Sequence, residues 1–418
     1  MHILISCFGS AGDVYPFLAI GQALRQRGHE VELLASPYFQ QRIEAAGLGF
    51  VQVGTLEDYQ RAVADTDLWH PRKSFSVVWQ HMQVHLRQAT QAVLDRARPD
   101  TVLVGSTLAW SSRMAQEKLG LPAATVHLSP SCIFSAEDPS VWPGLSGLRH
   151  FPAWLVRPIQ RAIEKLALDP VVLPELNALR ADFGLAPVQR VMSQWSHSPD
   201  RVICAFPDWF AAPQSDWPAN SITTDFPRWN AAPGAVLDPM LARFLQSGPP
   251  PVGITPGSAM AHGKPVFERA LAACDALGLR AVVITPYRDQ LPEKLPPFAR
   301  HVSYVPFDLL LPKLAAFVHH GGIGTLAQTL AAGVPQLITP FAHDQFDNAL
   351  RIQKLGAGLS VAPLASTAKW TRALHQLVGN EAIAEASHRW AVRSHEAEPA
   401  ANRIATQIEQ LQRKGQTP

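Results

Sequence analysis

Two histidines and three glycines stand together early in the stretch FVHHGGIGTLAQTLAAGVPQ, residues 317–336. The apolar run before them is typical of a strand, and TLAQTLAAG predicts a helix that ends at Gly333. The glycines would let backbone amides approach an anion, and a helix start offers unpaired N–H groups and a partial positive charge. His319 or His320 could add a donor without a metal. We therefore predict a diphosphate site, with a tight strand-to-helix turn around a core histidine as the alternative.

An acid and an amide follow the next predicted strand, in TPFAHDQFDNALRIQKLG. Parallel strands deliver the residues that follow them to one edge of the sheet, so Asp344 and Gln345 should reach the same edge as the glycine-rich loop. Their side chains offer acceptors and donors that suit adjacent sugar hydroxyls. Together the two segments favour a site for a sugar linked to a diphosphate.

Other phosphate and metal motifs are incomplete. GSAG after the first predicted strand lacks the GxGxxG spacing of a dinucleotide site, which disfavours a nicotinamide-dependent enzyme. GSAMAHGKP, residues 257–265, has one residue too many between its glycines for a P-loop, which disfavours a nucleoside triphosphatase. The DTD stretch at residues 65–67 has the form that some sugar transferases use for a metal, but it falls in a predicted loop. We expect no metal and no other cofactor.

Short apolar runs alternate with helical patterns along the chain, which predicts an α/β fold with two doubly wound parallel sheets. The runs HILISCF, EVELLAS, GFVQVG, TVLVGS and AATVHLS predict the first sheet, and VGIT, RAVVIT, HVSYV, AAFVHH and QLITPF the second. A Pro-rich break, SGPPPVGITPGS, separates the two sets, and we expect domains over residues 1–230 and 231–418. The last helical stretch, roughly residues 369–413, could run back across the first domain.

Length and composition exclude several classes of protein. A chain of 418 residues exceeds what one hydrophobic core usually supports, which agrees with two domains. The balance of 36 basic and 34 acidic residues gives no case for nucleic-acid binding. The four cysteines form no CxxC pair and the N-terminus lacks a basic n-region, so we expect a cytoplasmic protein. No apolar stretch approaches the ~20 residues that span a bilayer.

The Pro- and Trp-rich middle of the chain contains one amphipathic helix, WLVRPIQRAIEKLALD, at residues 154–169. Leu155, Ile159, Ile163 and Leu166 would share one face, with charged side chains elsewhere. We expect this helix to pack on the core, with a membrane-surface helix as the alternative. Such a flap would suit a lipid-like acceptor, and it leaves open a peripheral association with the inner membrane or with a partner enzyme.

The segments HHGGIGT and AHDQFDNA, one strand and helix apart, resemble the signature of the family-1 glycosyltransferases of the GT-B fold. The resemblance implies two Rossmann-like domains that face each other across a cleft. The N-terminal domain would bind the acceptor, and the C-terminal domain would bind a nucleotide-sugar donor. The residues that the resemblance assigns to the diphosphate and the sugar are His320, with His319 beside it, Gly322, Gly324, Thr325, Asp344 and Gln345.

Two further segments extend the resemblance. GITPGSA resembles the first strand and loop of the family's donor domain, which makes Gly257 and Ser258 phosphate contacts. SYVPFDLLLPKLAAFVHH resembles the segment that holds the base. There Tyr304 or Phe307 would stack on the base, while the main chain of Val305 would hydrogen-bond to its edge.

The ribose contact departs from the family pattern. Many relatives carry a glutamate where this chain has Gln328, and in them that glutamate holds the ribose hydroxyls. Without the carboxylate, we expect weaker hydrogen bonding to the ribose hydroxyls. A deoxyribose donor, such as a dTDP-sugar, would tolerate the change.

The implied reaction needs a base to take the proton of the acceptor hydroxyl as it attacks the anomeric carbon. The family carries a histidine or an aspartate in a G-[HD]-x-x-P pattern, which falls on Asp13 in FGSAGDVYPF, with Gly12 beside it near the donor. The alternative role of Asp13 is an N-cap of the predicted helix. An ordinary aspartate pKa of ~3.9 makes a weak base unless the site raises it. The later stretch VGSTLAWSS offers no aspartate as a relay partner.

The segments GSAGDVYPF, QWSHSPDRV, APQSDWP and AHDQFDNA are similar to the rhamnosyltransferase family of rhamnolipid biosynthesis. This similarity implies inverting transfer of L-rhamnose from dTDP-L-rhamnose to a hydroxyl of a 3-(3-hydroxyalkanoyloxy)alkanoic acid. One alternative is a UDP-glucose-dependent transferase for a sterol, a polyketide or another small apolar alcohol. A sugar-nucleotide epimerase on the same fold and a non-catalytic GT-B partner protein are the others.

Overall fold

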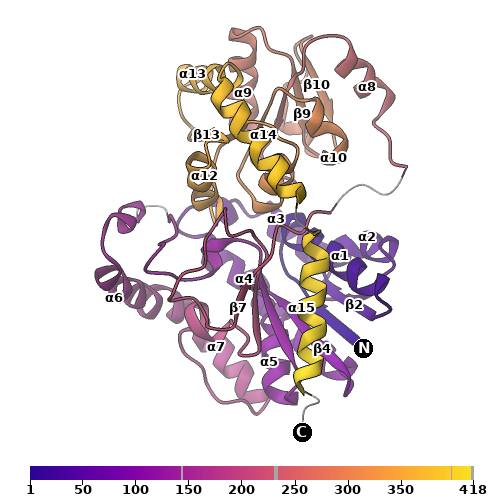
Figure 1. Cartoon of the computed structure of the whole chain (residues 1–418), viewed down its shortest axis with the longest axis vertical. Helices are drawn as coiled ribbons and strands as arrows, with labels where there is room; N and C mark the ends of the chain where they lie inside the picture. Colours follow the sequence, from indigo (N-terminus) through magenta and orange to yellow (C-terminus); the bar gives the residue numbers. More distant parts are fainter. Residues whose placement is uncertain (143–144, 230–233, 397, 416–418) are drawn as a thin grey trace. The chain divides into compact units, whose positions relative to one another are not determined.

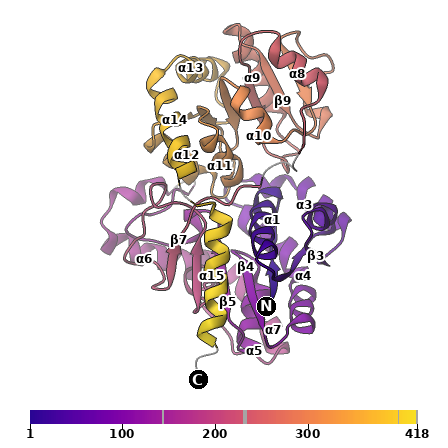
Figure 2. The same cartoon turned by 45° about the vertical axis from the view of Figure 1, so that its right-hand side comes forward.

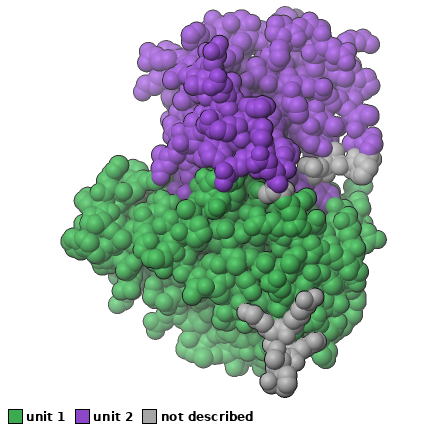
Figure 3. Space-filling model, viewed as in Figure 1, with its two compact units in different colours: residues 1–227, 398–418 green, residues 228–397 purple. Residues whose placement is uncertain are grey.

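Figures 1 and 2 show a computed structural model of the chain, which describes residues 1–142, 145–229, 234–396 and 398–415. The chain divides into two units, coloured green and purple in Figure 3. The first unit comprises Met1–Pro227 together with Glu398–Pro418, and the second comprises Arg228–Ala397. The boundary expected between residues 230 and 231 lies outside the described residues.

A seven-stranded parallel sheet forms the centre of the first unit, in the order β3-β2-β1-β4-β5-β6-β7. The chain moves outward from β1 through β2 and β3 and then resumes at β4, so β1 and β4 are the neighbours at which the strand order reverses. The strands are β1 (His2–Ser6), β2 (Glu30–Ala35), β3 (Gly49–Gln52), β4 (Thr101–Ser106), β5 (Ala123–His127), β6 (Arg201–Cys204) and β7 (Ser221–Thr223).

The strands of this sheet follow from their sequences. HILIS in β1, TVLVGS in β4 and AATVH in β5 are buried along their whole length, as expected of parallel strands covered on both faces. All five runs predicted for the first sheet form strands. β6 and β7 lie in the irregular middle of the chain, where the sequence pattern did not predict them.

Eight α-helices are described in the first unit, and the last of them comes from the C-terminal end of the chain (Figure 1). α15 packs along α1, and Arg27 donates hydrogen bonds to Thr406 (2.8 Å) and Glu409 (3.0 Å). The helices are α1 (Ala11–Gln26), α2 (Gln40–Ala45), α3 (Leu56–Ala64), α4 (Ser74–Arg96), α5 (Trp110–Leu119), α6 (Ala153–Ile163), α7 (Asp169–Asp182) and α15 (Ala400–Gly415).

The amphipathic helix of the middle segment differs from its prediction. After α6 the helix widens into a π-turn at Glu164–Leu168, which shifts the faces of the side chains that follow. Leu166, expected on the buried face, is 74% exposed, whereas Glu164 is 1% exposed. Glu164 is held inward because it accepts hydrogen bonds from the backbone N–H (2.7 Å) and hydroxyl (2.5 Å) of Ser193.

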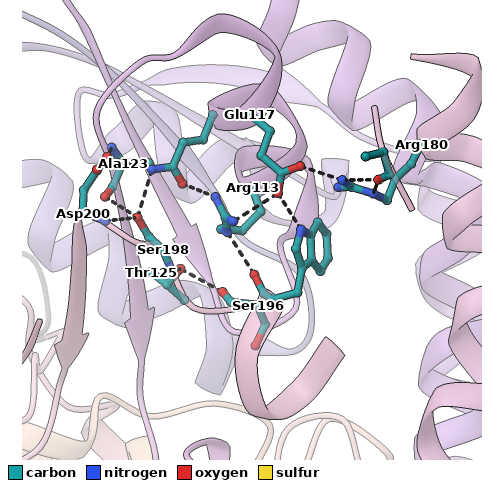
Figure 4. A network of polar contacts seen from close by, with 11 residues as sticks. Arg113, Glu117, Ala123, Thr125, Arg180, Ser196, Ser198 and Asp200 are labelled. Carbon is teal, nitrogen blue, oxygen red and sulfur yellow. Dashed lines mark hydrogen bonds and ion pairs between the residues drawn. The ribbon is translucent and has the colours of Figure 1, made fainter. Parts of the chain in front are cut away.

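A polar network fixes the QWSHSPDRV segment to the first sheet (Figure 4). Asp200 accepts hydrogen bonds from Gln116 (2.7 Å) and from the backbone N–H of Ala123 (2.9 Å). Ser198 donates to the carbonyl of Ala123 (2.7 Å). Farther along, the Trp195 indole donates to Glu117 (2.6 Å). This motif is therefore a structural connection between α5, β5 and the segment entering β6.

The second unit contains a six-stranded parallel sheet in the order β10-β9-β8-β11-β12-β13. All five predicted runs form strands, and β13 was not predicted. The strands are β8 (Val252–Thr255), β9 (Ala281–Ile284), β10 (Ala299–Val302), β11 (Ala316–His319), β12 (Gln336–Ile338) and β13 (Gly358–Ser360). The helices are α8 (Pro239–Gln246), α9 (Lys264–Ala276), α10 (Phe307–Leu310), α11 (Ile323–Ala331), α12 (Gln345–Lys354), α13 (Thr367–Val378) and α14 (Glu381–Glu396).

The helical stretch expected over residues 369–413 is three helices, α13, α14 and α15. Asn380 lies between α13 and α14 and caps the start of α14, because its side chain accepts a hydrogen bond from the N–H of Ile383. Pro399 precedes α15, and proline cannot continue a helix that arrives from its N-terminal side. Only α15 lies in the first unit.

Candidate functional site

The glycine-rich loop lies at the switch point of the second sheet. β8 and β11 are neighbours, and the chain runs outward from β8 to β10 in one direction and from β11 to β13 in the other. In doubly wound sheets, ligands bind beyond the carboxyl ends of the strands at such a point. The loops after β8 and β11 begin there, at Pro256 and His320.

The ring of His320 lies between two glycines. Gly257 in the β8 loop has a φ of +111°, and a Cβ on it would be 2.9 Å from His320 Cε1. A Cβ on Gly322 would overlap His320 Nε2. Both positions therefore need glycine while the imidazole stays where it is. The two loops that were assigned to phosphate from their sequences meet at this ring.

The start of α11 presents backbone amides at the same place. Gly322 is the N-cap residue, it makes no side-chain cap, and the first hydrogen bond of the helix is from Leu326 N–H to the Gly322 carbonyl (3.0 Å). Ile323, Gly324 and Thr325 come before Leu326 in the chain, so their N–H groups have no carbonyl acceptor within the helix. Three adjacent N–H groups with the positive end of the helix dipole suit a phosphate group.

His319 shapes the loop from inside the core. Its Nδ1 accepts a hydrogen bond from the Gly321 N–H (3.1 Å), so its Nε2 carries the proton and donates to Gln336 Oε1 (2.9 Å). The side chain has no exposed surface. Burial lowers its pKa to about 4, although the bond to Gln336 opposes that shift. His319 is therefore a neutral support of the loop, and the contact with the donor stays a prediction for His320.

His320 is also neutral at ordinary pH. Burial, followed by the neighbouring His319 and His343, lowers its pKa to about 3. A neutral imidazole can donate one hydrogen bond to a phosphate oxygen. His343, which sequence reasoning missed, has a φ of +57° and immediately precedes Asp344. Strained backbone of this kind is concentrated at functional sites in proteins.

Asn348 connects the predicted sugar site to the glycine loop. Its fully buried side-chain amide donates to the carbonyl of Gly321 (2.9 Å) and to the carboxylate of Asp344 (2.8 Å). One side chain thus fixes both the loop after β11 and the acid at the start of α12. Sequence reasoning missed Asn348, although it lies four residues after Asp344 and therefore one helical turn away.

Gln345 is oriented by the loop after β12. Its Oε1 accepts hydrogen bonds from the N–H groups of Phe341 (2.7 Å) and Ala342 (3.2 Å). Within the described part of the chain, no acceptor bonds its Nε2 group, which is therefore the end that could donate to a ligand. The arrangement places an acid and an oriented amide at adjacent positions, as the sequence predicted for a sugar site.

The segment predicted to hold a base divides into exposed and packed residues. The Tyr304 side chain is 60% exposed, and Val305 beside it is buried. Phe307 begins α10 and packs edge-on against Phe317, with ring centroids 5.3 Å apart. Tyr304 is therefore the aromatic ring that could accept a base, because Phe307 is engaged in the core.

Ser258 is exposed in the loop after β8, and a buried glutamine holds that loop. The side chain of Gln290 accepts a hydrogen bond from Gly263 N–H (2.8 Å) and donates to the Met260 carbonyl (2.8 Å). Gln290 comes from the connection after β9, so no local pattern in the sequence marks this role. Gln328 lies on α11 with a partly exposed side chain, one turn after Gly324 and Thr325.

In the first unit, Asp13 lies at the corresponding switch point, where α1 follows β1. It is the third residue of the helix and closes a capping box, in which Ser10 donates to its carboxylate from the N–H (2.8 Å) and the hydroxyl (3.0 Å). Burial raises the pKa of Asp13 while these two hydrogen bonds lower it, and the net shift is upward. The prediction of Asp13 as the N-cap is therefore wrong in position, because the helix begins at Ala11, Ser10 is its N-cap and Asp13 lies inside the first turn. The raised pKa improves Asp13 as a base. Gly12 beside it is exposed.

Two neutral histidines lie in contact at the same sheet edge, at the carboxyl ends of β4 and β5. Thr107 Oγ1 is 3.0 Å from His127 Nδ1, and His127 Nε2 is 2.9 Å from His197 Nδ1. Burial lowers the pKa of His127 well below its ordinary value and that of His197 to about 4. Sequence reasoning looked only for an aspartate in VGSTLAWSS and missed these contacts, because the paired residues are 20 and 70 positions apart in the chain.

The DTD stretch forms a local turn. Asp65 accepts a hydrogen bond from the N–H of Asp67 (2.9 Å), and Asp67 pairs with Lys73 (2.9 Å). Across the residues that the structure describes, no three or more His, Cys, Asp and Glu side chains form a group that could hold a metal ion. Likewise, none of the described helices is both long and apolar enough to cross a bilayer.

Two family models match separate parts of the chain. Residues 3–135 match the N-terminal domain of glycosyltransferase family 28. Residues 270–411 match the C-terminal domain of the erythromycin biosynthesis protein CIII-like family. The second match includes the glycine loop, Asp344 and Gln345, and the first includes Asp13.

Characterised relatives cover most of the chain at low identity. O-mycaminosyltylonolide 6-deoxyallosyltransferase of Streptomyces fradiae is 27% identical over 399 residues, which are 87% of this chain and 86% of that protein. Sterol 3-beta-glucosyltransferase of Candida albicans is 26% identical over 395 residues, which are 87% of this chain but 25% of that protein. The similarity therefore supports a glycosyltransferase without deciding its substrates.

Solved structures show the fold. The glycosyltransferase of kitacinnamycin superposes with a TM-score of 0.75 at 21% identity, covering 98% of both chains. The spinosyn rhamnosyltransferase SpnG in complex with thymidine diphosphate gives a TM-score of 0.70 at 20% identity, covering 98% of this chain and 100% of that one. The two parallel-sheet units thus have the GT-B fold that was expected from the sequence.

Proposed function

We propose that this glycosyltransferase is inverting and metal-independent, and that it moves a deoxyhexose from a nucleoside-diphosphate donor to a hydroxyl of a lipid-like acceptor. The best candidates are dTDP-L-rhamnose as donor and a 3-(3-hydroxyalkanoyloxy)alkanoic acid as acceptor. The observation that carries the proposal is the His320 ring between Gly257 and Gly322, beside the free amides of α11.

The diphosphate would bind to main chain and to one neutral ring. Glycine at positions 257 and 322 leaves the backbone open, and the amides at the start of α11 supply donors without a lysine or a metal. His320 would add one hydrogen bond. As the sugar leaves, negative charge develops on the diphosphate, and donors already in position stabilise that charge.

The sugar would bind beside the diphosphate. Asp344 accepts from sugar hydroxyls, and the Nε2 group of Gln345 donates to them. Asn348 fixes the acid relative to the loop, because it bonds both Asp344 and Gly321. Because the acid and the amide are held in place, they would bond fully only to a sugar whose hydroxyls have the matching stereochemistry.

The acceptor would react by single displacement. Asp13 would take the proton of the acceptor hydroxyl as its oxygen attacks the anomeric carbon, and the nucleoside diphosphate would depart from the opposite face. One displacement inverts the anomeric centre. The raised pKa of Asp13 supports this role, since a carboxylate with an ordinary pKa is a poor base for a hydroxyl proton.

Two observations support a deoxyribose donor. Gln328 carries no charge at the position where the resemblance to the family-1 glycosyltransferases implies a glutamate that holds the ribose. The spinosyn rhamnosyltransferase SpnG, which has the same fold, has a solved structure in complex with thymidine diphosphate. Rhamnose is favoured by the similarity of the segments GSAGDVYPF and QWSHSPDRV to the rhamnolipid enzymes.

Thermal unfolding with dTDP and with UDP tests the donor. A ligand at a hundredfold excess over its dissociation constant stabilises by ~2.7 kcal/mol, which corresponds to a shift of about 5–10 °C in the melting temperature of a unit of this size. We expect the larger shift with dTDP. Mass spectrometry after incubation with dTDP-L-rhamnose and the hydroxy-acid acceptor should then show one added deoxyhexose. A shift with neither nucleotide would refute the proposed site.

A UDP-glucose-dependent sterol transferase is the second candidate, because the sterol 3-beta-glucosyltransferase of Candida albicans matches 87% of the chain. It predicts the larger thermal shift with UDP and a hexose, not a deoxyhexose, on the product. Loss of free donor without any acceptor present would instead indicate an epimerase or a hydrolase. Nucleotide binding without turnover on any acceptor would favour a non-catalytic partner protein.

A further inference from the structure

The outward side of α6 and its π-turn carries two parallel stripes of exposed side chains. Trp154, Pro158, Ala162 and Leu166 recur every four residues, and all four are exposed. Residues four apart lie on adjacent turns of one side of an α-helix, so Trp154, Pro158 and Ala162 form an apolar stripe, and Leu166 follows it in the π-turn with its side chain exposed. Trp154 and Leu166 at its ends are each 74% exposed, and a globular helix would normally bury side chains of this kind.

The second stripe is basic and lies directly beside the first. Arg157, Arg161 and Lys165 also recur every four residues and are also exposed. Arg157 lies 3.8 Å from Asp216, a loose pair, while neither Arg161 nor Lys165 forms an ion pair within the described ranges. The segment therefore offers positive charge that the rest of the unit neutralises only in part.

The segment itself adds no negative charge to this side. Glu164 is the one acid between residues 149 and 168. It is turned inward to Ser193, as described above, so it does not face the two stripes. The segment thus presents an apolar stripe and a basic stripe and turns its own acid inward, and this combination suits a negatively charged surface with an apolar interior.

The helix is fixed from within, so its outward side is a stable surface. Val156 is fully buried, and Gln160 donates a hydrogen bond to the carbonyl of Ser135 (2.8 Å). Phe151, just before α6, is 52% exposed and extends the apolar stripe toward its N-terminal end. Figures 1 and 2 both show α6 at the margin of the first unit, where none of that unit's described helices or strands covers its outer side.

We infer that the outward side of α6 docks the protein onto an anionic phospholipid surface. Phe151, Trp154 and Leu166 enter the boundary between head groups and acyl chains, where the amphipathic indole is favoured. Arg161 and Lys165 contact the head-group phosphates, and Arg157 joins them by exchanging its loose contact with Asp216. The docking is peripheral, and it is independent of whether the enzyme transfers rhamnose or another sugar.

Sedimentation of the full chain with vesicles tests this inference without any sugar transfer. We expect binding to vesicles of phosphatidylcholine with phosphatidylglycerol, little binding to phosphatidylcholine alone, and weaker binding as salt is raised. A basic residue near an anionic surface changes partitioning by roughly fivefold, so Arg161→Gln/Lys165→Gln should reduce binding on the order of 25-fold. Trp154→Ser should also reduce binding, and circular dichroism would verify that each variant is folded.

Matched controls come from the second unit. Lys313→Gln/Lys369→Gln removes the same net charge from exposed positions, and Leu364→Ser replaces a side chain that is 73% exposed. Both should bind vesicles like the wild type. Equal losses in the two charge pairs would overturn the inference, because binding would then follow net charge alone. Unchanged binding of Trp154→Ser, or no binding of the wild type to anionic vesicles at low salt, would overturn it as well.

Discussion

Gly322→Ala is the sharpest probe of the His320 ring. The φ of Gly322 is −61°, which alanine adopts without strain, so the backbone does not oppose the substitution. The added Cβ would instead overlap His320 Nε2. The imidazole must therefore move, and the hydrogen bond that we assign from it to the donor diphosphate should be lost.

The size of the effect follows from the bond that is lost. A hydrogen bond to a charged group contributes ~1.5–3 kcal/mol, so the dissociation constant for dTDP should rise about 10- to 150-fold. Alanine is also a poorer N-cap than glycine and can destabilise the helix start by ~1 kcal/mol, which thermal unfolding would register separately. His320→Ala should weaken dTDP binding by a similar factor without this N-cap effect.

Calorimetric titration of dTDP into the wild type, the two single variants and the double variant separates these contributions. Because the added Cβ acts through the ring, Gly322→Ala should have little further effect once His320 is alanine, and the two losses should be strongly non-additive. Gly147→Ala is the control, since a Cβ at that position would meet open space.

Two results would refute the reasoning. If folded Gly322→Ala bound dTDP like the wild type, the displaced ring would not be a donor contact. If the losses from Gly322→Ala and His320→Ala simply added, the glycine would act through the helix start and not through the ring. Either outcome would remove His320 from the proposed diphosphate contacts and leave the assignment to the amides at the start of α11.

Three further predictions concern other parts of the two units. Asp13→Asn should lower turnover by a factor of ~10²–10⁴ while leaving dTDP affinity nearly intact. Since burial raises the pKa of Asp13, wild-type turnover should fall on the acid side at a higher pH than for an ordinary aspartate; unchanged turnover in the variant would exclude Asp13 from the mechanism. Asn348→Ala should raise the KM for the donor and cost ~1–3 kcal/mol of stability, because the Gly321 carbonyl loses its buried partner; an unchanged KM would contradict its positioning role. The folded-state pKa of His319, about 4, lies below the ordinary value of 6.5, so its contribution to stability is present above pH ~6.5 and is lost as the pH falls toward 4. Relative to His319→Gln, the wild type should lose about 2 kcal/mol of unfolding free energy between pH 7.5 and 5, measured by denaturant titration.

The sequence predicted the fold because the strands are short, apolar and separated by clear turns. It also predicted the glycine-rich loop, because the strand end, the glycines and the helix start are contiguous between residues 317 and 336. The position of Asp344 and Gln345 near this loop was predicted because the carboxyl ends of parallel strands meet at one edge of the sheet. These inferences all rest on local patterns or on the direction of the strands.

The parts that were missed depend on contacts between distant residues. Gln290 holds Gly263 from 27 residues away, and His127 bonds His197 across 70 residues. No local pattern marks such partners. The family resemblance placed the diphosphate contact on His320, but local patterns alone did not separate the two histidines of HHGGIGT, because the inward turn of His319 is set by Gln336 on the neighbouring strand.

The return of α15 to the first unit has a consequence for engineering. A chimaera that exchanges the donor-binding half must be cut twice, near residue 227 and again near residue 398, since a single junction would pair α1 with a foreign C-terminal helix. Such a hybrid would lose the contacts of Arg27 with Thr406 and Glu409. For the same reason, deletion of about the last 20 residues should unfold the N-terminal unit, which loses α15. The second unit should stay folded, because the truncated chain would end at its boundary.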